Sequence, residues 1–359
     1  MSSDRNSDHT MNRRQMLRMT AMAGAAAAGS SLMLTTAADA ASKTQAAAGS
    51  DGGKIIAEEY WGNKKGVKLW VYRKYIAADI ANKPVLFMVH GSSYSGKTMF
   101  DLDVPGRDYS VMDHFVRLGY DVWTMDHEGY GHSDRTSSYS DIASGVDDLK
   151  VAIDIMKKVS GKSTATFFGQ SSGALRAAKF ANVYPEHTTS LILGALVYTG
   201  EGSRTLKKRK EQLPKLLASN VRKVDAKFYS GVFTRDKPGS ADPDMGEIVA
   251  AAELKYGDTV PNGTYLDMVT KLPVCEPEKI LCPVLIARGE YDGIASDEDV
   301  LNFYEKLPHA DKQIAKMGGL AHTALLGVNR NRLFHVMQAF LSMPAGVPLG
   351  DAVSNEDPG

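Results

Sequence analysis

The hydrophobic and polar positions of this 359-residue chain follow two alternating patterns. Short, continuous apolar runs such as residues 84–90 are typical of strands buried on both faces. Between them lie longer stretches such as residues 141–158, in which apolar residues recur at spacings of three and four, as in a helix that packs on a sheet. Strands and helices in alternation predict a mostly parallel sheet flanked by helices, with right-handed crossovers.

The pattern predicts eight strands and five helices for this sheet. The strands are expected at residues 54–61, 67–75, 84–90, 120–126, 165–168, 190–198, 282–288 and 311–317. The helices are expected at residues 109–118, 141–158, 174–184, 297–307 and 323–341. We expect the first two strands to form an antiparallel hairpin, because the five residues between them are rich in turn formers.

The alternation lapses over residues 199–278, which divides the expected core into a first part, 54–198, and a second part, 279–343. We interpret residues 199–278 as a mainly helical cap inserted over the carboxyl ends of the strands, where ligands bind in such sheets. Its basic run, residues 207–210, is interpreted as a solvated helix face rather than an anion-steering patch. Residues 344–359 are expected to form a loose tail.

The amino-terminal residues resemble a bacterial twin-arginine export signal. Arg13 and Arg14 precede a mildly apolar stretch rich in Ala, Gly and Met, and Ala38 and Ala40 are small enough for a signal peptidase. We therefore expect residues 1–40 to be a signal cleaved after Ala40, residues 41–53 to be a linker, and the mature protein to be periplasmic or secreted. An uncleaved membrane anchor is the alternative, but a core interrupted by Thr and Ser would span a membrane poorly.

Composition excludes several classes of protein. The chain is 43% hydrophobic and 23% charged, as in an ordinary soluble protein, and its zero net charge indicates no nucleic-acid partner. Two cysteines exclude a disulfide-dense scaffold or a cysteine-rich metal site, and we expect neither a metal nor an organic cofactor. Cys275 and Cys282 could form a disulfide in an oxidising compartment or remain buried thiols.

Residues 91–98 match the phosphate-binding pattern Gly-x4-Gly-Lys-Thr literally and follow a predicted strand. A phosphate loop also needs a helix whose amino terminus holds the phosphates. Residues 99–107 are instead typical of a loop, so we do not interpret this match as a nucleotide site.

The most informative motif is Gly-Gln-Ser-Ser-Gly at residues 169–173, between a β-prone run and a helical run. Gly-x-Ser-x-Gly in this context is the pattern of a nucleophile elbow, a tight strand-to-helix turn that presents its serine above the sheet. Its glycines leave room for close packing. Ser171 is therefore the candidate nucleophile.

Together with His90-Gly91, the Asp-His-Glu-Gly-Tyr-Gly-His-Ser stretch at residues 126–133 and a late Asp and His, this motif resembles the α/β-hydrolase family. The resemblance covers roughly residues 54–343. The sequence of the 126–133 stretch is similar to that of monoacylglycerol-lipase-like and other esterase members. The resemblance implies an α/β-hydrolase fold and a serine hydrolase acting on small-molecule carboxylic esters.

The resemblance also implies the remaining catalytic residues. His322, in the loop after the last strand, would be the general base, with His90, His127 and His132 as competitors that we expect to order their own loops. Asp292, in the loop after the strand at 282–288, would orient the histidine, and Glu201 is the alternative acid.

The oxyanion hole is expected from two backbone N–H groups, those of Ser92 and Ser172. An apolar substrate pocket could be lined by seven large side chains. These are Tyr94, Met99, Phe100, Phe228, Tyr229, Phe233 and Met268.

The predicted activity is hydrolysis of esters through an acyl-enzyme, in an exported protein without a stable membrane anchor. A lactonase, an amidase or an acyltransferase would use the same triad, because these reactions share the tetrahedral intermediate. A ligand sensor that retains the fold without catalysis is an alternative of a different class. A serine rather than an aspartate at position 171 argues against dehalogenase and epoxide-hydrolase chemistry.

Overall fold

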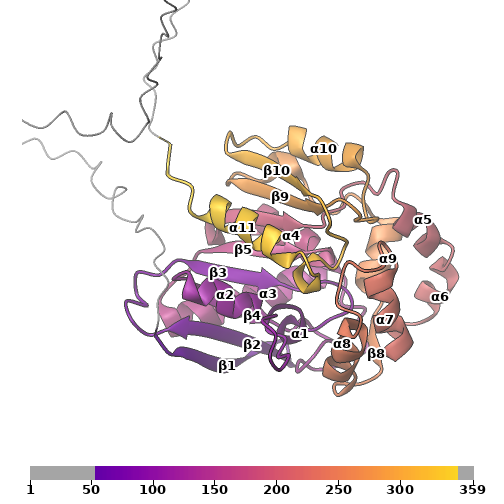
Figure 1. The fold of residues 1–359 in the computed structure, drawn as a ribbon, viewed down its shortest axis with the longest axis horizontal. Coiled ribbons are helices and arrows are strands. Elements are labelled where there is room, and N and C mark those ends of the chain that lie inside the picture. Colours follow the sequence, from indigo (N-terminus) through magenta and orange to yellow (C-terminus); the bar gives the residue numbers. More distant parts are fainter. Residues whose placement is uncertain (1–52, 347–359) are drawn as a thin grey trace, which may run out of the picture. The chain divides into compact units, whose positions relative to one another are not determined.

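The computed structural model describes residues 53–346, and the proposed signal, most of the linker and most of the tail lie outside them. An eight-stranded sheet forms the centre of the described part, with strand order β1-β2-β4-β3-β5-β6-β9-β10 (Figure 1). The β1 and β2 strands pair antiparallel, as do β2 and β4, whereas the remaining neighbours pair parallel. The predicted α/β-hydrolase architecture is therefore confirmed.

The elements of the core occur where the hydrophobic pattern predicts them, with shifted ends. The strands of the sheet are β1 Ile55–Lys64, β2 Val67–Ile76, β3 Val85–Val89, β4 Asp121–Met125, β5 Ala165–Gln170, β6 Thr188–Gly194, β9 Val284–Gly289 and β10 Lys312–Met317. The core helices are α1 Gly96–Phe100, α2 Val111–Arg117, α3 Ile142–Ser160, α4 Ser172–Val183, α10 Asp297–Glu305 and α11 Arg330–Leu341.

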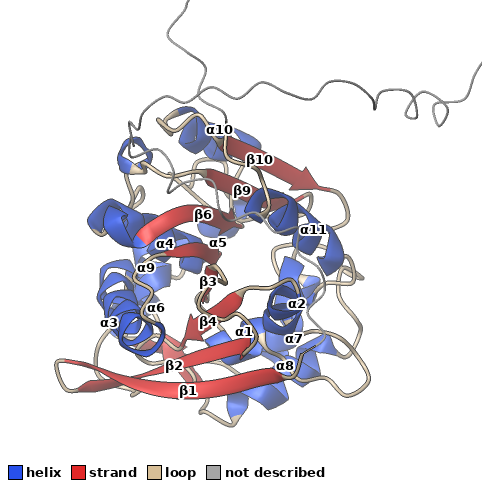
Figure 2. Ribbon diagram, turned by 90° about the vertical axis from the view of Figure 1, so that its left-hand side faces the viewer, coloured by secondary structure: helices blue, strands red, loops and turns tan. Residues whose placement is uncertain are grey.

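Both faces of the sheet are buried, because helices cover each of them (Figure 2). All five residues of β3 are buried, and they alternate between two apolar clusters. Phe87 belongs to the cluster under α3 and α4, whereas Met88 belongs to the cluster under α2 and α11. This two-sided burial explains why the central strands have continuous apolar sequences.

Residues 199–278, which we call the cap segment, lie between β6 and β9 in the chain and consist mainly of short helices. These are α5 Arg204–Lys210, α6 Leu213–Ala218, α7 Ala226–Thr234, α8 Met245–Leu254 and α9 Gly263–Thr270. Two short strands, β7 Val221–Lys223 and β8 Thr259–Pro261, form a separate antiparallel pair.

The first hairpin is tighter than the predicted five-residue loop. Strand β1 continues to Lys64, and the turn consists of Lys65 and Gly66, both with positive φ (50° and 97°). Two residues of this conformation connect antiparallel strands without splaying them. Gly62, which was expected in the loop, lies in the strand and pairs with Leu69. A Cβ on Gly62 would come within 2.4 Å of Val151, so the lack of a side chain lets α3 pack closely on β1.

The strand predicted at 190–198 was too long at its carboxyl end. Strand β6 ends at Gly194, and Ala195 turns the chain with a φ of 52°. Residues 195–198 are buried, which explains their apolar sequence, but they have left the sheet. The backbone N–H of Tyr198 donates instead to the carboxylate of Asp299, at 2.8 Å.

The helix predicted at 323–341 is broken. A single 3₁₀ turn, Ala324–Leu326, precedes α11, and between them the N–H of Val328 donates to the carbonyl of Ser240 in the cap segment at 3.0 Å. This tertiary contact takes the N–H out of a continuous helix, so the chain changes direction there.

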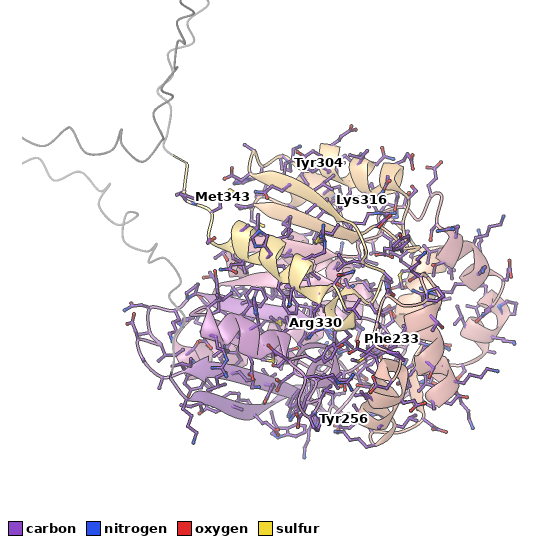
Figure 3. All side chains as sticks on the ribbon, viewed as in Figure 1. Phe233, Tyr256, Tyr304, Lys316, Arg330 and Met343 are labelled. Carbon is purple, nitrogen blue, oxygen red and sulfur yellow. The ribbon has the colours of Figure 1, made fainter. Side chains whose placement is uncertain are left out.

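Two side chains labelled in Figure 3 show how the cap segment contacts the core. The ring of Phe233 from α7 stacks on Tyr94, with 6.4 Å between ring centroids. The ring of Tyr256, which follows α8, contacts that of His132 at 4.7 Å, and its hydroxyl lies 3.2 Å from Nε2 of the same histidine. The segment is therefore packed on the loops that follow β3 and β4.

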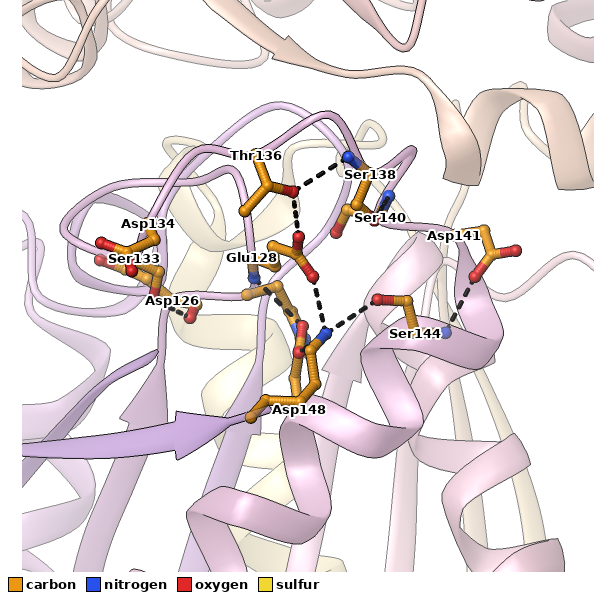
Figure 4. A network of polar contacts seen from close by, with 12 residues as sticks. Asp126, Glu128, Ser133, Asp134, Thr136, Ser138, Ser140, Asp141, Ser144 and Asp148 are labelled. Carbon is orange, nitrogen blue, oxygen red and sulfur yellow. Dashed lines mark hydrogen bonds and ion pairs between the residues drawn. The ribbon is translucent and has the colours of Figure 1, made fainter. Parts of the chain in front are cut away.

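A buried polar network fixes the loop after β4 (Figure 4). Lys64 at the end of β1 contacts the carboxylates of Asp148 and Glu128, the latter at 2.8 Å, and donates to the hydroxyl of Ser144 at 3.0 Å. Asp148 also accepts from the N–H of Glu128 and lies 3.1 Å from Nδ1 of His127. One ammonium thus offsets two nearly fully buried carboxylates.

Replacing Lys64 with Met should destabilise the fold strongly, because it leaves two buried carboxylates without their cation. We expect a loss of about 3 kcal/mol in the free energy of unfolding, measured by urea denaturation. The matched control is Lys150→Met, which breaks the exposed Lys150–Asp154 pair and should cost less than about 1 kcal/mol. Equal effects of the two substitutions would contradict this assignment.

Candidate active site

The chain makes a strained turn at Ser171, between the end of β5 and the start of α4. Ser171 has a φ of 59° and a ψ of −123°, which is unusual for a residue with a side chain. Its N–H donates to the carbonyl of Gly194 at 2.8 Å, which ties the turn to the end of β6. Such strain persists only where the surroundings impose it, and it is typical of functional sites.

The two glycines of the motif are required by packing. A Cβ on Gly169 would lie 2.3 Å from the carbonyl oxygen of Gly173, and a Cβ on Gly173 would lie 2.0 Å from the carbonyl oxygen of Val89 in β3. Both distances are far below van der Waals contact. The first turn of α4 therefore lies directly against the neighbouring strand.

Three predicted side chains come together in one hydrogen-bonded series. Nε2 of His322 lies 3.0 Å from Oγ of Ser171, and its Nδ1 lies 2.9 Å from Oδ1 of Asp292. Asp292 is only 4% exposed and also accepts from the N–H of Ile294. Burial raises the pKa of the Asp292 carboxyl, but the nearby His322 and the hydrogen bonds outweigh it, so the net pKa lies below the ordinary value.

Loops from the ends of three strands position this series. Asp292 follows β9, and His322 follows β10. The side-chain amide of Gln170 donates to the backbone carbonyl of His322 at 2.8 Å, so the residue before the serine also holds the histidine. The sequence motif gave no indication of this contact.

The other acids take no part in the series. Glu201, the alternative acid, is exposed, and its backbone N–H donates to the hydroxyl of Thr199. Glu290 is also exposed and accepts from the N–H of Gly319 at 2.8 Å.

The three competing histidines order loops, as expected. Nδ1 of His90 lies 2.8 Å from the carbonyl of Gly91, and its Nε2 accepts from the N–H of His127. Burial lowers the pKa of both His90 and His127 well below the ordinary value, so each is neutral. His132 contacts Asp126.

Ser92 and Ser172 lie together beside the elbow. The hydroxyl of Ser92 donates to that of Ser172 at 2.7 Å and accepts from Thr264 at 2.8 Å. Within residues 53–346, neither backbone N–H has a protein acceptor. The hydroxyl of Tyr130 donates to the carbonyl of Ser92 at 3.1 Å and so helps to fix this loop.

A cavity opens beside Ser171 and His322, and its lining differs from the prediction. Of the seven predicted side chains, Tyr94 and Met99 line it. Phe100, Tyr229, Phe233 and Met268 are instead buried in the core, and Phe228 lines a different hollow. The apolar part of the cavity also includes Val232, Leu325 and Leu326, the last two from the 3₁₀ turn before α11.

The basic run at 207–210, which was interpreted as a solvated helix face, is exposed at three of its four residues. Lys207, Lys208 and Lys210 are exposed, but Arg209 lines the cavity together with Arg235 and Tyr265. In the helix α5, Arg209 points toward the cavity while the neighbouring lysines point to solvent. This difference cannot be recognised in a sequence of four consecutive basic residues. Sequence reasoning missed all three cavity residues.

The phosphate-loop match has a different structural role. Residues 96–100 form the short helix α1, so the loop predicted from residue 99 was wrong at its start. The N–H of Ser95 donates to the carboxylate of Glu253 at 2.9 Å, and that of Gly96 donates to Asp126 at 2.7 Å. Carboxylates of the protein itself therefore take up N–H groups that a phosphate loop would offer to its ligand.

Other expectations concern features outside this site. Cys275 and Cys282 are both free thiols. In the described part of the chain, no helix is long and apolar enough to cross a membrane, and no cluster of His, Cys, Asp and Glu is arranged to hold a metal ion.

Gly173→Ala should destabilise the protein by at least about 3 kcal/mol, because the new methyl group would collide with the backbone of β3. Gly231→Ala in α7 is the matched control, since a Cβ there meets nothing within 4 Å. That change should raise stability by about 0.5 kcal/mol through helix propensity. Denaturant unfolding of both variants measures whether the free energy of unfolding falls for Gly173→Ala and rises for Gly231→Ala. A Gly173→Ala protein as stable as the wild type would refute the close approach of α4 to β3.

Known proteins that are similar in sequence include two hydrolases. Caffeoylshikimate esterase of Arabidopsis thaliana is 24% identical over 276 residues, which cover 71% of this chain and 75% of that protein. A probable lysophospholipase L2 of Haemophilus influenzae is 26% identical over 147 residues, but these span only 43% of that protein.

Solved structures share the fold at low sequence identity. A bromoperoxidase from Bacillus anthracis has a TM-score of 0.59 and 18% identity, and covers 80% of this chain and 100% of its own. Carboxylesterase CesB from Bacillus subtilis has a TM-score of 0.55 and 15% identity, with 80% and 92% covered. The Hydrolase_4 family, described as "Serine aminopeptidase, S33", matches residues 104–327, which include all three members of the hydrogen-bonded series. The chain therefore belongs to this family and is a hydrolase of the α/β-hydrolase fold.

Proposed function

We propose that the protein hydrolyses carboxylic esters through Ser171, His322 and Asp292. The observation that carries this proposal is the pair of hydrogen bonds in series, 3.0 Å and 2.9 Å long, which starts at a serine on a strained elbow. A serine hydroxyl is a weak nucleophile unless a base accepts its proton. His322 is within reach to do so, and Asp292 fixes its orientation and stabilises its charged form.

The proposed reaction has two halves. Oγ of Ser171 attacks the ester carbonyl while Nε2 of His322 takes the hydroxyl proton, and the resulting oxyanion accepts from the N–H groups of Ser92 and Ser172. Each such donor is typically worth about 3 kcal/mol in the transition state. His322 then gives the proton to the leaving alcohol, which leaves an acyl group on Ser171. Water, activated by the same histidine, releases the acid.

The family description suggests a second candidate, an aminopeptidase. Such an enzyme must bind the free ammonium group of a peptide, for which a buried carboxylate is the natural partner. The described residues that line the cavity include Arg209 and Arg235 but neither Asp nor Glu. Because these guanidinium groups would repel an ammonium group, the cavity favours an ester substrate over a peptide with a free amino terminus. The names of the esterase and lysophospholipase relatives also support an ester substrate.

Ser171→Ala should abolish both labelling by a fluorophosphonate and ester hydrolysis. We expect mass spectrometry to find the adduct on Ser171 of the wild type, and kcat/KM for a chromogenic ester to fall by at least about 10⁴-fold in the variant. Ser137→Ala, at an exposed serine, is the control and should behave as the wild type. Turnover by Ser171→Ala near the wild-type level would overturn the mechanism, and a folded wild type that is not labelled would favour the ligand sensor.

We also propose that the protein is exported through the twin-arginine machinery and cleaved after Ala40. The paired Arg13 and Arg14 before a mildly apolar stretch support this proposal. Amino-terminal sequencing of the protein from a bacterial periplasmic fraction should give Ala41 as the first residue, and replacing both arginines with Lys should keep the protein in the cytosol. An intact chain that remains in the cytosol with Arg13 and Arg14 present would contradict export.

A further inference from the structure

The cavity beside Ser171 carries more positive charge than the ester chemistry requires. Arg209 from α5 and Arg235, which follows α7, both line it, and the triad uses neither. A neutral ester needs only apolar surface and the oxyanion donors. Two guanidinium groups at the substrate cavity therefore call for an explanation.

Arg209 has no carboxylate partner among residues 53–346. Its guanidinium carbon lies 3.5 Å from the ring centre of Tyr265, and its hydrogen-bond contact is with the sulfur of Met268, at 3.8 Å. Burial lowers the pKa of Arg209 to about 10, so the group still carries its charge at neutral pH. A partly buried guanidinium group without a carboxylate partner is costly, and a ligand carboxylate would reduce that cost.

The surroundings of Arg209 add to the positive potential. The guanidinium carbon of Arg222 lies 3.8 Å from the ring centre of the same Tyr265, and Arg222 is fixed by the carbonyls of Ser92 and Pro261, at 2.6 Å and 2.5 Å. Burial raises the pKa of Tyr265, but Arg209 and Arg222 outweigh it and bring the pKa down to about 7. Two guanidinium groups thus lie against one phenol ring.

The anionic groups near these three guanidinium groups already have partners. Arg235 is paired with Asp236, at 2.9 Å, and its side chain is 34% exposed at the rim of the cavity. The phenolate of Tyr265 and the carboxylate of Asp236 together offset two of the three guanidinium groups. The carboxylate of Asp292 is hydrogen-bonded to His322 and to none of the three guanidinium groups. Arg209 therefore lines the cavity without a carboxylate from the described part of the chain bonded to it, and that position is available to a carboxylate of a ligand.

We propose that Arg209, assisted by Arg235, binds a carboxylate on the substrate, so that the preferred substrates are esters that carry a negative charge. This inference rests on the proposed ester hydrolysis. The planar guanidinium group matches the two oxygens of a carboxylate, and the apolar side chains of Met99, Val232 and Leu325 line the same cavity, where they can contact the rest of a small substrate. Arg209 is thus a specificity-determining residue and not a catalytic one.

The first test compares isosteric substrates on the wild-type protein. para-Nitrophenyl hemisuccinate and para-nitrophenyl isocaproate have the same leaving group and nearly the same acyl shape, but only the former carries a carboxylate. After subtraction of spontaneous hydrolysis, kcat/KM should be about tenfold or more higher for the anionic ester. Acetyl esters of meta-hydroxybenzoate and meta-isopropylphenol make the same comparison on the alcohol side. A preference for the neutral ester in both pairs would overturn the proposal.

The second test assigns the preference to Arg209. In Arg209→Met, the ratio of kcat/KM for the anionic ester to that for its neutral isostere should fall about tenfold or more, whereas Arg209→Lys should retain part of the ratio. Lys208→Met, an exposed neighbour on the same helix, is the matched control and should leave the ratio unchanged. An unchanged ratio in a folded Arg209→Met protein, or an equal loss in Lys208→Met, would refute the role of Arg209.

These outcomes separate the two proposals. If neutral esters are hydrolysed in a Ser171-dependent manner without a preference for the anion, the carboxylate subsite is wrong and the esterase proposal stands. If no ester is hydrolysed and Ser171 is not labelled, the esterase proposal itself fails. Should Arg209→Met not fold, the wild-type comparison and Arg209→Lys still decide the question.

Discussion

The close approach of α4 to β3 is the constraint on which the site depends. The carbonyl oxygen of Val89 lies where a Cβ on Gly173 would have to be, so the helix can begin at this place only if that residue has no side chain. This packing leaves Ser171 in a strained conformation at the end of β5, with its hydroxyl 3.0 Å from His322. Ser171 is thus held by steric exclusion, and its hydrogen bond with His322 involves a hydroxyl group that the backbone has already placed.

A second layer of polar contacts holds the loops around this turn. Lys64, Glu128 and Asp148 fix the loop after β4, and His90 accepts a hydrogen bond from the backbone of that loop. Tyr130 from the same loop reaches the carbonyl of Ser92. Because Ser92 follows β3 and Tyr130 follows β4, the network connects the ends of neighbouring strands. It gives a structural role to most of the motif at residues 126–133, which does not itself touch the reacting atoms.

The arginines at the cavity bear on which substrate is bound, whereas the series of Ser171, His322 and Asp292 bears on the reaction. Ser171, His322 and Asp292 suit acyl transfer to water from many substrates. Arg209, Arg222 and Arg235 come from the cap segment, two of them line the cavity, and a chain of zero formal net charge gives no hint that they gather there. The proposed preference for anionic esters follows from the position of Arg209 at the cavity without a carboxylate partner among the described residues, since guanidinium groups that are partly removed from water gain most from such a partner.

Apolar runs and spacings of three and four were enough to predict the succession of strands and helices along the chain, because they indicate which faces are buried. The glycines and flanking elements of the motif at 169–173 indicated Ser171, whereas His322 and Asp292 were implied by the resemblance to the α/β-hydrolase family. The end of β6 at Gly194 could not be predicted locally, since the chain beyond it bonds to Asp299, about a hundred residues away in the sequence. Only the tertiary structure brought Arg209 into the cavity, because the face that a basic helix turns inward is set by what it packs against, here the ring of Tyr265.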